Sequence, residues 1–218
     1  MKNKIISVEE AMKFINDGTT LMIGGFMGVG TPKILIEAVA KKGVKNLTVM
    51  CNDGAVPGEG SGLLIRNRQV KKLYATHIGL NPEVGQLMNS GEMEVELIPQ
   101  GTFAERIRIG GAGIGGFLTP TGIGTDIEKG KQKITVNGKE YILELPLRAD
   151  VALIRGSIVD KLGNVFYRGT TNNFNQVMAT AADIVIVAAE KIVEPGEIDP
   201  HLVMTPSLFV DYIVGGEQ

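Results

Sequence analysis

A short glycine-rich run is the first segment of this chain that could do chemistry. It comprises Gly24, Gly25, Phe26, Met27, Gly28, Val29 and Gly30, and Thr31-Pro32 after it is typical of a helix start. Glycines let a ligand approach backbone N–H groups closely, and a helix N-terminus adds partial positive charge for a phosphate or developing oxyanion. The spacing matches neither a dinucleotide-binding turn nor a P-loop. From these residues alone, a ligand site and a tight structural turn are equally good interpretations.

Two polar side chains follow later apolar runs and could face the same crevice. Asn52-Asp53-Gly54 comes after one run, and Pro99-Gln100-Gly101-Thr102 after another. The Asn52 amide can donate to a carbonyl or carboxylate, although an Asx-type turn is the simpler interpretation of that tripeptide. Gln100 offers a donor and an acceptor, and it stays free for a ligand if Thr102 caps the next helix.

A third candidate is the cluster of five glycines between residues 110 and 116. Such a cluster fits a backbone anion nest, a mobile lid or a merely flexible loop. The apolar Phe117 and Leu118 that follow indicate that the segment packs against something.

Histidine and cysteine chemistry is sparse in this sequence. His77 and His201 are isolated, Cys51 is the only cysteine, and no metal-ligand spacing connects them, so we expect no metal site. The sequence has no Gly-x-Ser-x-Gly elbow, which disfavours hydrolase chemistry. Cys51 ends an apolar run and is interpreted as a small core hydrophobe.

The composition is that of an ordinary globular protein. The 218 residues suit a single domain spanning 1–218, and 44% of them are apolar and 21% charged. A net charge of −2 with no tryptophan does not indicate a nucleic-acid partner. No apolar run reaches about 18 residues, so no membrane partner is expected. A lone cysteine excludes an internal disulfide framework and favours the cytoplasm.

Alternating helices and strands must position these candidate residues. The alternation predicts an α/β fold with an open, mostly parallel sheet covered by helices on both faces. Ser7 with Glu10 and Thr102 with Glu105 have the spacing of capping boxes. The predicted helices cover residues 7–15, 31–43, 81–90, 102–108, 175–182 and 205–214. The predicted strands cover residues 19–25, 47–51, 73–78, 95–98, 151–158, 165–167 and 184–188.

The middle of the chain interrupts this alternation. Residues 133–136 and 140–144 flank Asn137-Gly138, and two alternating runs around Asn-Gly are a strong hairpin signal. We interpret residues 110–148 as a glycine-rich loop and β-hairpin insertion sitting on the sheet, and not as a separate domain.

Residues 17–32, which include the whole glycine-rich run, resemble the signature of the A (alpha) subunits of family I CoA-transferases. Within the family the chain is most similar to acetate or butyrate:acetoacetate CoA-transferases. It is less similar to the 3-oxoacid and 3-oxoadipate enzymes, which differ around residues 77–82. Further matches to the family are Cys51-Asn52-Asp53, Ser90-Gly91-Glu92, Pro99-Gln100-Gly101-Thr102, Glu105-Arg106-Ile107, Gly110-Gly111-Ala112-Gly113, Thr119-Pro120-Thr121-Gly122, Gly124-Thr125 and residues 145–152.

This resemblance implies a fold shared with sugar-phosphate isomerases and a ping-pong reaction. A glutamate of a B (beta) subunit would carry CoA as a thioester between an acyl-CoA, such as acetoacetyl-CoA, and acetate or butyrate. No Ser-Glu-Asn-Gly-like motif occurs here, so the resemblance implies no catalytic nucleophile in this chain and an α2β2 or larger assembly. CoA would be a substrate, with no permanently bound cofactor.

The resemblance also implies roles for particular residues. The run from Gly24 to Gly30 would bind CoA, and backbone N–H groups of Gly28, Val29 and Gly30 would stabilise the oxyanion. Asn52 and Gln100 would support the reaction near the partner's glutamate. Asp53 is left out of the site, because an acidic side chain near anionic substrates is unfavourable. The alternatives are one chain of a 3-oxoacid or 3-oxoadipate CoA-transferase, a sugar-phosphate isomerase-like enzyme and a non-catalytic ligand-binding domain.

Overall fold

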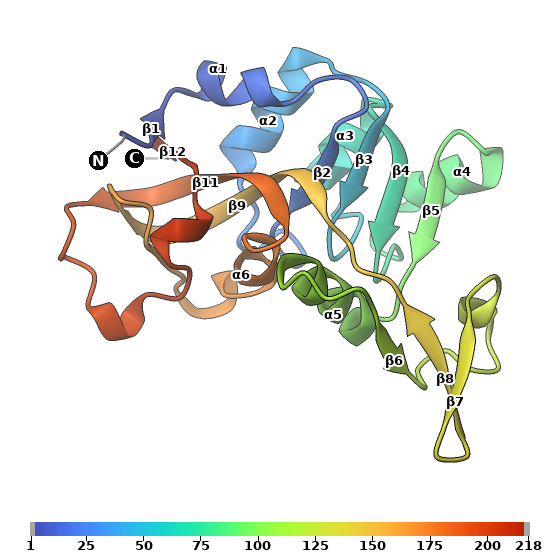
Figure 1. The fold of residues 1–218 in the computed structure, drawn as a ribbon. Helices are drawn as coiled ribbons and strands as arrows, with labels where there is room; N and C mark the ends of the chain where they lie inside the picture. The colour runs from blue at the N-terminus through green and yellow to red at the C-terminus, as the bar shows by residue number, and fades with distance from the viewer. Residues whose placement is uncertain (1–2, 216–218) are drawn as a thin grey trace.

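A parallel β-sheet forms the centre of the computed structural model, which describes residues 3–215 (Figure 1). The ends of the predicted 1–218 domain lie outside the described residues. Strands follow the order β1-β12-β11-β9-β2-β3-β4-β5, and each neighbouring pair along this path is parallel. The two-residue β10 (Val165–Phe166) pairs antiparallel with β9. The strands of the path are β1 (Ile5–Ile6), β2 (Thr20–Ile23), β3 (Leu47–Met50), β4 (Val70–Ala75), β5 (Glu94–Leu97), β9 (Ala149–Asp160), β11 (Ala182–Val193) and β12 (Tyr212–Gly215).

Helices cover both faces of this sheet, as predicted, and two hydrophobic clusters separate the layers (Figure 1). Leu21 and Ile23 of β2 point into one cluster, which also holds the apolar faces of α1 to α4. Met22 points into the other, with α5 and α6. Burial on both faces explains why the central strands β2, β9 and β11 are largely apolar. The helices are α1 (Val8–Ala11, continued by a 3₁₀ turn), α2 (Lys33–Lys42), α3 (Ser61–Arg66), α4 (Pro82–Ser90), α5 (Gln100–Gly111) and α6 (Phe174–Met178).

The predicted hairpin is present, but it does not sit on the main sheet. β7 (Lys133–Val136) and β8 (Lys139–Glu144) join at Asn137 and Gly138, whose φ angles of 51° and 74° suit a type I′ turn. β6 (Phe117–Thr119) adds a third strand, and this small sheet projects beyond the main one (Figure 1).

The glycine cluster before this small sheet divides between helix and loop. Gly110 and Gly111 belong to the last turn of α5, and a Cβ on Gly110 would lie 2.1 Å from the Leu147 carbonyl oxygen. On Gly111 it would lie 2.4 Å from Thr180 Oγ1. These two glycines therefore serve close packing of the helix against the chain.

Some of the helix caps predicted from the sequence are present in the structure and others are not. The Ser7 capping box is present, and α2 ends at Gly43 in the left-handed conformation, as expected. Thr31 and Thr102 do not cap their helices: Pro32 precedes α2, and Pro99 precedes α5. The Phe103 N–H donates to the Pro99 carbonyl at 2.8 Å, so α5 begins at Gln100 and Thr102 is buried within it.

The predicted helix over residues 205–214 is wrong. Ser207–Phe209 form a single 3₁₀ turn, and the chain then enters β12 between β11 and β1. Ile213 and Val214 point into opposite hydrophobic clusters, and this alternation of apolar residues suits a buried strand. No helix within residues 3–215 is long and apolar enough to cross a membrane.

Candidate functional site

The connections after β2, β3 and β5 meet at the carboxyl edge of the sheet. The Gln100 side chain, from the first residue of α5, donates from Nε2 to Asn52 Oδ1 at 2.8 Å. The Met27 N–H donates to Asp53 Oδ2 at 2.8 Å. The glycine-rich loop and the two predicted polar segments are therefore brought together, in the position where open α/β sheets bind ligands.

The tip of the glycine-rich loop is a tight turn. Phe26 and Val29 exchange backbone hydrogen bonds of 3.0 and 2.9 Å. Met27 and Gly28 between them have φ angles of 48° and 81°. The turn leaves apolar side chains exposed, with 39% of Phe26, 58% of Met27 and 46% of Val29 accessible. The loop therefore presents an apolar tip around a polar backbone.

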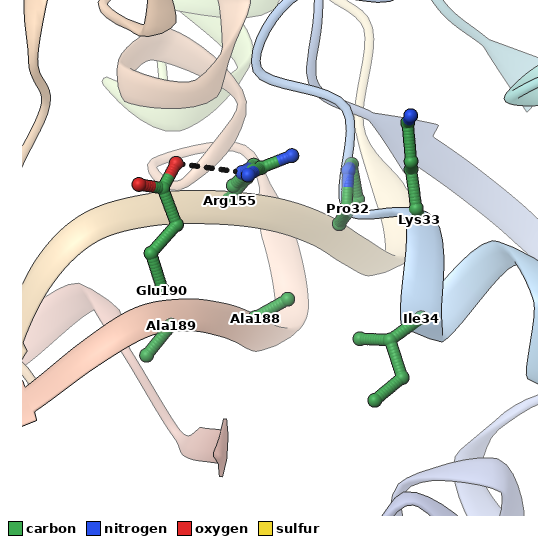
Figure 2. A pocket seen from close by; sticks show the side chains of 7 residues that line it. All are labelled: Pro32, Lys33, Ile34, Arg155, Ala188, Ala189 and Glu190. Atoms are coloured by element: carbon green, nitrogen blue, oxygen red, sulfur yellow. Dashed lines mark hydrogen bonds and ion pairs between the residues drawn. The ribbon is translucent and has the colours of Figure 1, made fainter. Parts of the chain in front are cut away.

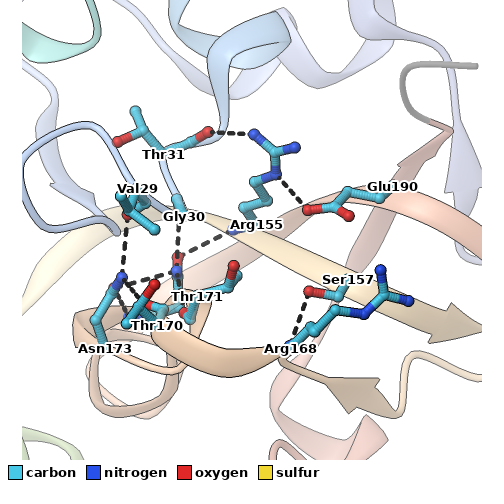
Figure 3. A network of polar contacts seen from close by, with 11 residues as sticks. Val29, Gly30, Thr31, Arg155, Ser157, Arg168, Thr170, Thr171, Asn173 and Glu190 are labelled. Atoms are coloured by element: carbon cyan, nitrogen blue, oxygen red, sulfur yellow. Dashed lines mark hydrogen bonds and ion pairs between the residues drawn. The ribbon is translucent and has the colours of Figure 1, made fainter.

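A pair of asparagines holds the other side of this loop. The Asn173 side chain accepts from the Gly25 N–H at 3.1 Å. It also donates to the Val29 carbonyl at 3.1 Å (Figure 3). The fully buried Asn175 donates to the Gly30 carbonyl at 2.9 Å. A Cβ on Gly24 would lie 1.8 Å from Asn175 Oδ1, so the asparagines leave no room for a side chain there.

These asparagines belong to the candidate site, and no motif in the sequence predicts this role for them. The available signal is an Asn-rich segment, residues 172–175, which overlaps the start of the predicted helix over residues 175–182. Their partners lie about 145 residues away in sequence, as the contacts from Asn173 to Val29 and from Asn175 to Gly30 show.

Arg155 on β9 extends this network toward α2. Its backbone N–H donates to Asn175 Oδ1 at 3.0 Å, and its Nε donates to Glu190 at 2.8 Å. Figure 3 shows the guanidinium also directed at the Thr31 carbonyl, 3.5 Å away. The hollow beside this ion pair, shown in Figure 2 with Pro32 and Ala188 at its wall, measures about 10 Å³. That is the volume for about one water molecule, so Arg155 and Glu190 hold the loop's base and do not form a substrate pocket.

Two of the three expected oxyanion donors have free N–H groups. The Val29 N–H is already committed to the Phe26 carbonyl. The N–H groups of Gly28 and Gly30 have no acceptor within the part of the chain that the structure describes. The geometry therefore leaves Gly28 and Gly30 as the candidate donors of this loop.

An apolar cavity of about 130 Å³ opens beside the turn. Met27, Ala55, Val56 and Leu80 contribute its apolar wall, and Lys33 and Glu59 bring opposite charges to its lining. This volume suits a short acyl group and is far too small for a whole coenzyme.

Asn52 and Asp53 are buried, with 3% and 6% of their surfaces accessible, whereas Gln100 is exposed. The Asn52 side chain already bonds Gln100 and Asp53, at 2.8 Å each. Of the two predicted supporting residues, the structure therefore leaves Gln100 as the one that a ligand can reach.

Cys51 is buried, as predicted for a core hydrophobe, and burial raises the pKa of its thiol to about 12. Its Sγ lies 3.0 Å from the Asp53 carbonyl oxygen. Within residues 3–215 no cluster of three or more His, Cys, Asp or Glu side chains is arranged to hold a metal ion.

The comparison with known families identifies the family of the whole chain. Residues 5–216 match the family described as coenzyme A transferase. This chain belongs to the coenzyme A transferase family. The predicted resemblance is confirmed, and so is the assignment of the chain as a CoA-transferase subunit of the A (alpha) type.

Curated relatives of this CoA-transferase chain match it over nearly its whole length. It is 56% identical over 214 residues to the acetoacetyl-CoA:acetate/butyrate CoA transferase alpha subunit of Clostridium acetobutylicum, covering 98% of each chain. It is 51% identical to the alpha subunit of the acetate CoA-transferase of Escherichia coli, covering 100% of this chain and 99% of the relative. The corresponding chain of a probable succinyl-CoA:3-ketoacid coenzyme A transferase of Bacillus subtilis is 47% identical, covering 99% and 91%.

Solved structures confirm the fold. An acyl-CoA transferase of Escherichia coli O157:H7, in a thioester complex with CoA, superposes with a TM-score of 0.88 at 24% identity. The match covers 98% of this chain but 47% of that one, so this chain spans about half of its length. Glutaconate coenzyme A-transferase of Acidaminococcus fermentans superposes with a TM-score of 0.85 at 19% identity, covering 97% and 75%.

Proposed function

We propose that this chain is the alpha subunit of a two-chain enzyme that moves CoA between acetoacetyl-CoA and acetate or butyrate. The observation that carries the proposal is the 56% and 51% identity, over whole chains, to alpha subunits of enzymes named for those carboxylates. The short apolar cavity beside the loop supports a small acyl group. We place residues 1–218 in one domain that works in the cytoplasm.

The covalent chemistry belongs to the partner chain in this proposal. The beta subunit's glutamate carboxylate attacks the thioester carbon, the C–S bond breaks, and CoA thiolate leaves an acyl–glutamyl anhydride. The thiolate attacks the glutamyl carbonyl, which releases the first carboxylate and leaves a glutamyl–CoA thioester. The second carboxylate repeats these steps in reverse, so no oxidant, metal or resident cofactor is needed.

This chain contributes binding and electrostatic stabilisation. In the proposal, the segment from Gly24 to Gly30 contacts CoA, and the free N–H groups of Gly28 and Gly30 face the oxyanion that forms in each attack. One such donor contributes about 2.7–4 kcal/mol to the transition state in known cases. Gln100 contacts the acyl or carboxylate group, and Asn52 holds Gln100 in place. The active site then lies between the two chains of an α2β2 or larger assembly.

A mixing experiment tests this division of labour. Acetoacetyl-CoA and acetate are supplied to this chain alone and then to this chain with its beta subunit. Turnover is expected only in the mixture. Full activity of the isolated chain would refute the proposal.

Mass spectrometry of the same mixture locates the intermediate. After incubation with acetoacetyl-CoA alone, the adduct of CoA mass is expected on a peptide of the beta chain. In this chain, Glu59 lines the cavity beside the loop, so the peptide that contains Glu59 is examined for the same adduct. An adduct on the Glu59 peptide would place the nucleophile here and overturn the assignment.

The second candidate function is that of a 3-ketoacid CoA-transferase that uses succinyl-CoA. The carboxylate that accepts CoA distinguishes it from the function proposed here. The 47% identity to the Bacillus subtilis relative supports this second candidate. Competition between acetate, butyrate and succinate at equal concentration separates the two. We expect kcat/KM for acetate and butyrate to exceed that for succinate, because the second carboxylate of succinate would lose water against the apolar wall of the cavity and meet Glu59 as well as Lys33 in its lining.

A further inference from the structure

The buried carboxylate of Asp53 has no role in the reaction proposed above, yet it accepts three hydrogen bonds. Oδ2 accepts from the Met27 N–H and from Asn52 Nδ2, each at 2.8 Å. Oδ1 accepts from the Ala55 N–H at 2.9 Å. With 6% of its surface accessible, this side chain is buried against the base of the glycine-rich loop.

We propose that Asp53 is a positioning residue that sets both the shape of the glycine-rich turn and the orientation of Gln100. The inference rests on the proposed function, because it assigns Asp53 a part in that same site. Its two effects run through separate bonds, one to Met27 and one to Asn52.

The orientation of Gln100 follows from the chemistry of each neighbour in turn. An ionised carboxylate only accepts hydrogen bonds, so Asn52 must direct its NH₂ group at Asp53. Asn52 Oδ1 then faces Gln100, which must donate from Nε2 over the observed 2.8 Å. The Thr76 hydroxyl lies 2.8 Å from the Asn52 backbone carbonyl and 3.1 Å from the same Oδ1. Gln100 is left with Oε1 and one N–H for a ligand.

The shape of the turn depends on the same carboxylate. The Met27 N–H is anchored to Asp53, while Met27 itself has a φ of 48° and an exposed side chain. This anchor sits one residue before Gly28, whose N–H is a candidate oxyanion donor. Asn173 fixes the far side of the loop at Val29, so the turn is held at both ends.

An asparagine of the same size could not replace this group. Three donors converge on the two Asp53 oxygens, whereas the amide in Asp53→Asn has one acceptor oxygen and places an NH₂ group against at least one donor. In place of Oδ1 the new NH₂ group faces the Ala55 N–H. In place of Oδ2 it faces the Met27 N–H, and Asn52 then turns its oxygen toward position 53 and its NH₂ group toward Gln100. Gln100 would have to turn over as well.

The test compares Asp53→Asn with Asp150→Asn in the complex with the beta subunit. Asp150 also accepts from a backbone N–H, that of Thr20 at 2.7 Å, but it lies at the opposite edge of the sheet. Asp53→Asn is expected to lower kcat about 100-fold, the usual effect of about 1 Å of misplacement, with a much smaller change in KM. Asp150→Asn is expected to keep wild-type kcat.

A double-variant cycle with Gln100→Ala separates positioning from loss of stability. If Asp53 acts partly through Gln100, the two losses of kcat combine to less than their product. Independent, multiplicative losses would overturn the link to Gln100. Wild-type kcat in a folded, assembled Asp53→Asn complex would overturn the whole inference.

NMR signals test the role of Asp53 independently of whether the complex transfers CoA. In the ¹⁵N-labelled complex, Asp53→Asn is expected to shift the side-chain amide signals of Asn52 and Gln100 and the Met27 N–H signal. A wild-type pair that lacks CoA-transfer activity would refute the proposed function alone. Unchanged signals at all three positions would refute the role of Asp53 even if the pair is active.

Discussion

Glycines at neighbouring positions of the loop serve different physical purposes. Gly24 has an ordinary φ but no space, because its Cβ would lie 1.8 Å from Asn175 Oδ1. Gly28 has open space around it but a φ of 81°, which residues with a Cβ rarely adopt. The same residue type is therefore required at Gly24 by packing and at Gly28 by backbone conformation.

This difference predicts distinct defects for two alanine variants. Gly24→Ala must displace Asn175 from Gly30, and such overpacking costs about 1–3 kcal/mol of unfolding free energy. Gly28→Ala is expected to cost about 1 kcal/mol and to reduce turnover while the complex still assembles. Urea unfolding and turnover of both variants check this. A larger loss of stability in Gly28→Ala than in Gly24→Ala would contradict the assignment.

Cys51 predicts a pH dependence of stability. Its thiol pKa is about 12 in the folded chain, against 9.0 for an unburied thiol, which we take for the unfolded chain. The unfolded state therefore loses this proton first as pH rises, so stability falls between about pH 9 and pH 12. At pH 10 this amounts to about 1 kcal/mol.

Urea unfolding at pH 8 and pH 10 measures this effect against Cys51→Ala. The variant should lose less stability between the two pH values than the wild type. Equal losses would show that the thiol does not contribute. Burial also raises the pKa of Tyr167, so part of the alkaline loss should persist in the variant.

At the scale of elements, one buried arginine ties α5 to the small projecting sheet. Arg106 donates from Nε to the Leu145 carbonyl at 2.7 Å and lies 3.8 Å from Glu144, which is 1% exposed. Its NH1 group contacts Glu96 of β5 at 3.0 Å. Arg106 therefore connects the helix that carries Gln100 to both sheets.

Arg106→Met should destabilise the protein, because it removes one of two cations beside the buried Glu144 carboxylate; the other, Lys131, lies 2.5 Å away. The loss should stay below about 3–5 kcal/mol, the cost of a buried charge left with no partner. Arg108→Met, on the same helix, is the matched control, since the Arg108–Glu105 pair is exposed and surface pairs contribute little. Thermal unfolding of both variants tests this prediction, and Arg106→Met should have the lower melting temperature. Equal melting temperatures would mean that Glu144 keeps its compensation from Lys131 alone.

Elements whose signals are local could be predicted from the sequence. The Ser7 cap, the Gly43 helix end and the Asn137-Gly138 hairpin each depend on neighbouring residues. β12 was predicted as a helix because Thr205-Pro206 has the local chemistry of a helix start. Its actual conformation depends on strands β1 and β11, which are distant in sequence.

In the candidate site, too, residues with local signals could be predicted and residues that depend on distant contacts could not. The loop and Gln100 were found from sequence, because strand ends and glycines mark them. Asn173 and Asn175 were missed, since their role exists only once β9 and α6 approach the loop. Asp53 was set aside on its charge, whereas the structure turns that charge inward onto three donors.

Over the whole molecule, the site is open on the side where the loop presents Phe26, Met27 and Val29. Exposed apolar side chains around unpaired N–H groups suit a surface that a partner chain covers. We therefore expect the beta subunit to protect this loop from solvent.

Hydrogen exchange followed by mass spectrometry tests this expectation. Peptides spanning residues 24–30 should exchange more slowly in the complex than in the isolated chain, and more slowly again with acyl-CoA. The complex without acyl-CoA is the control for the second effect. Unchanged exchange on assembly would place the loop away from the partner.

The pairing of the first strand with the last has a consequence for protein synthesis. Ile5 and Ile6 of β1 align with Ile213 and Val214 of β12, which also completes the edge of β11. At about 5–20 residues per second, a ribosome needs about ten to forty seconds between making these two strands. During that interval β1 emerges with its partner not yet translated. The sheet can close only after Tyr212–Gly215 have been made, so a chain that stops before β12 would keep an open edge at β11.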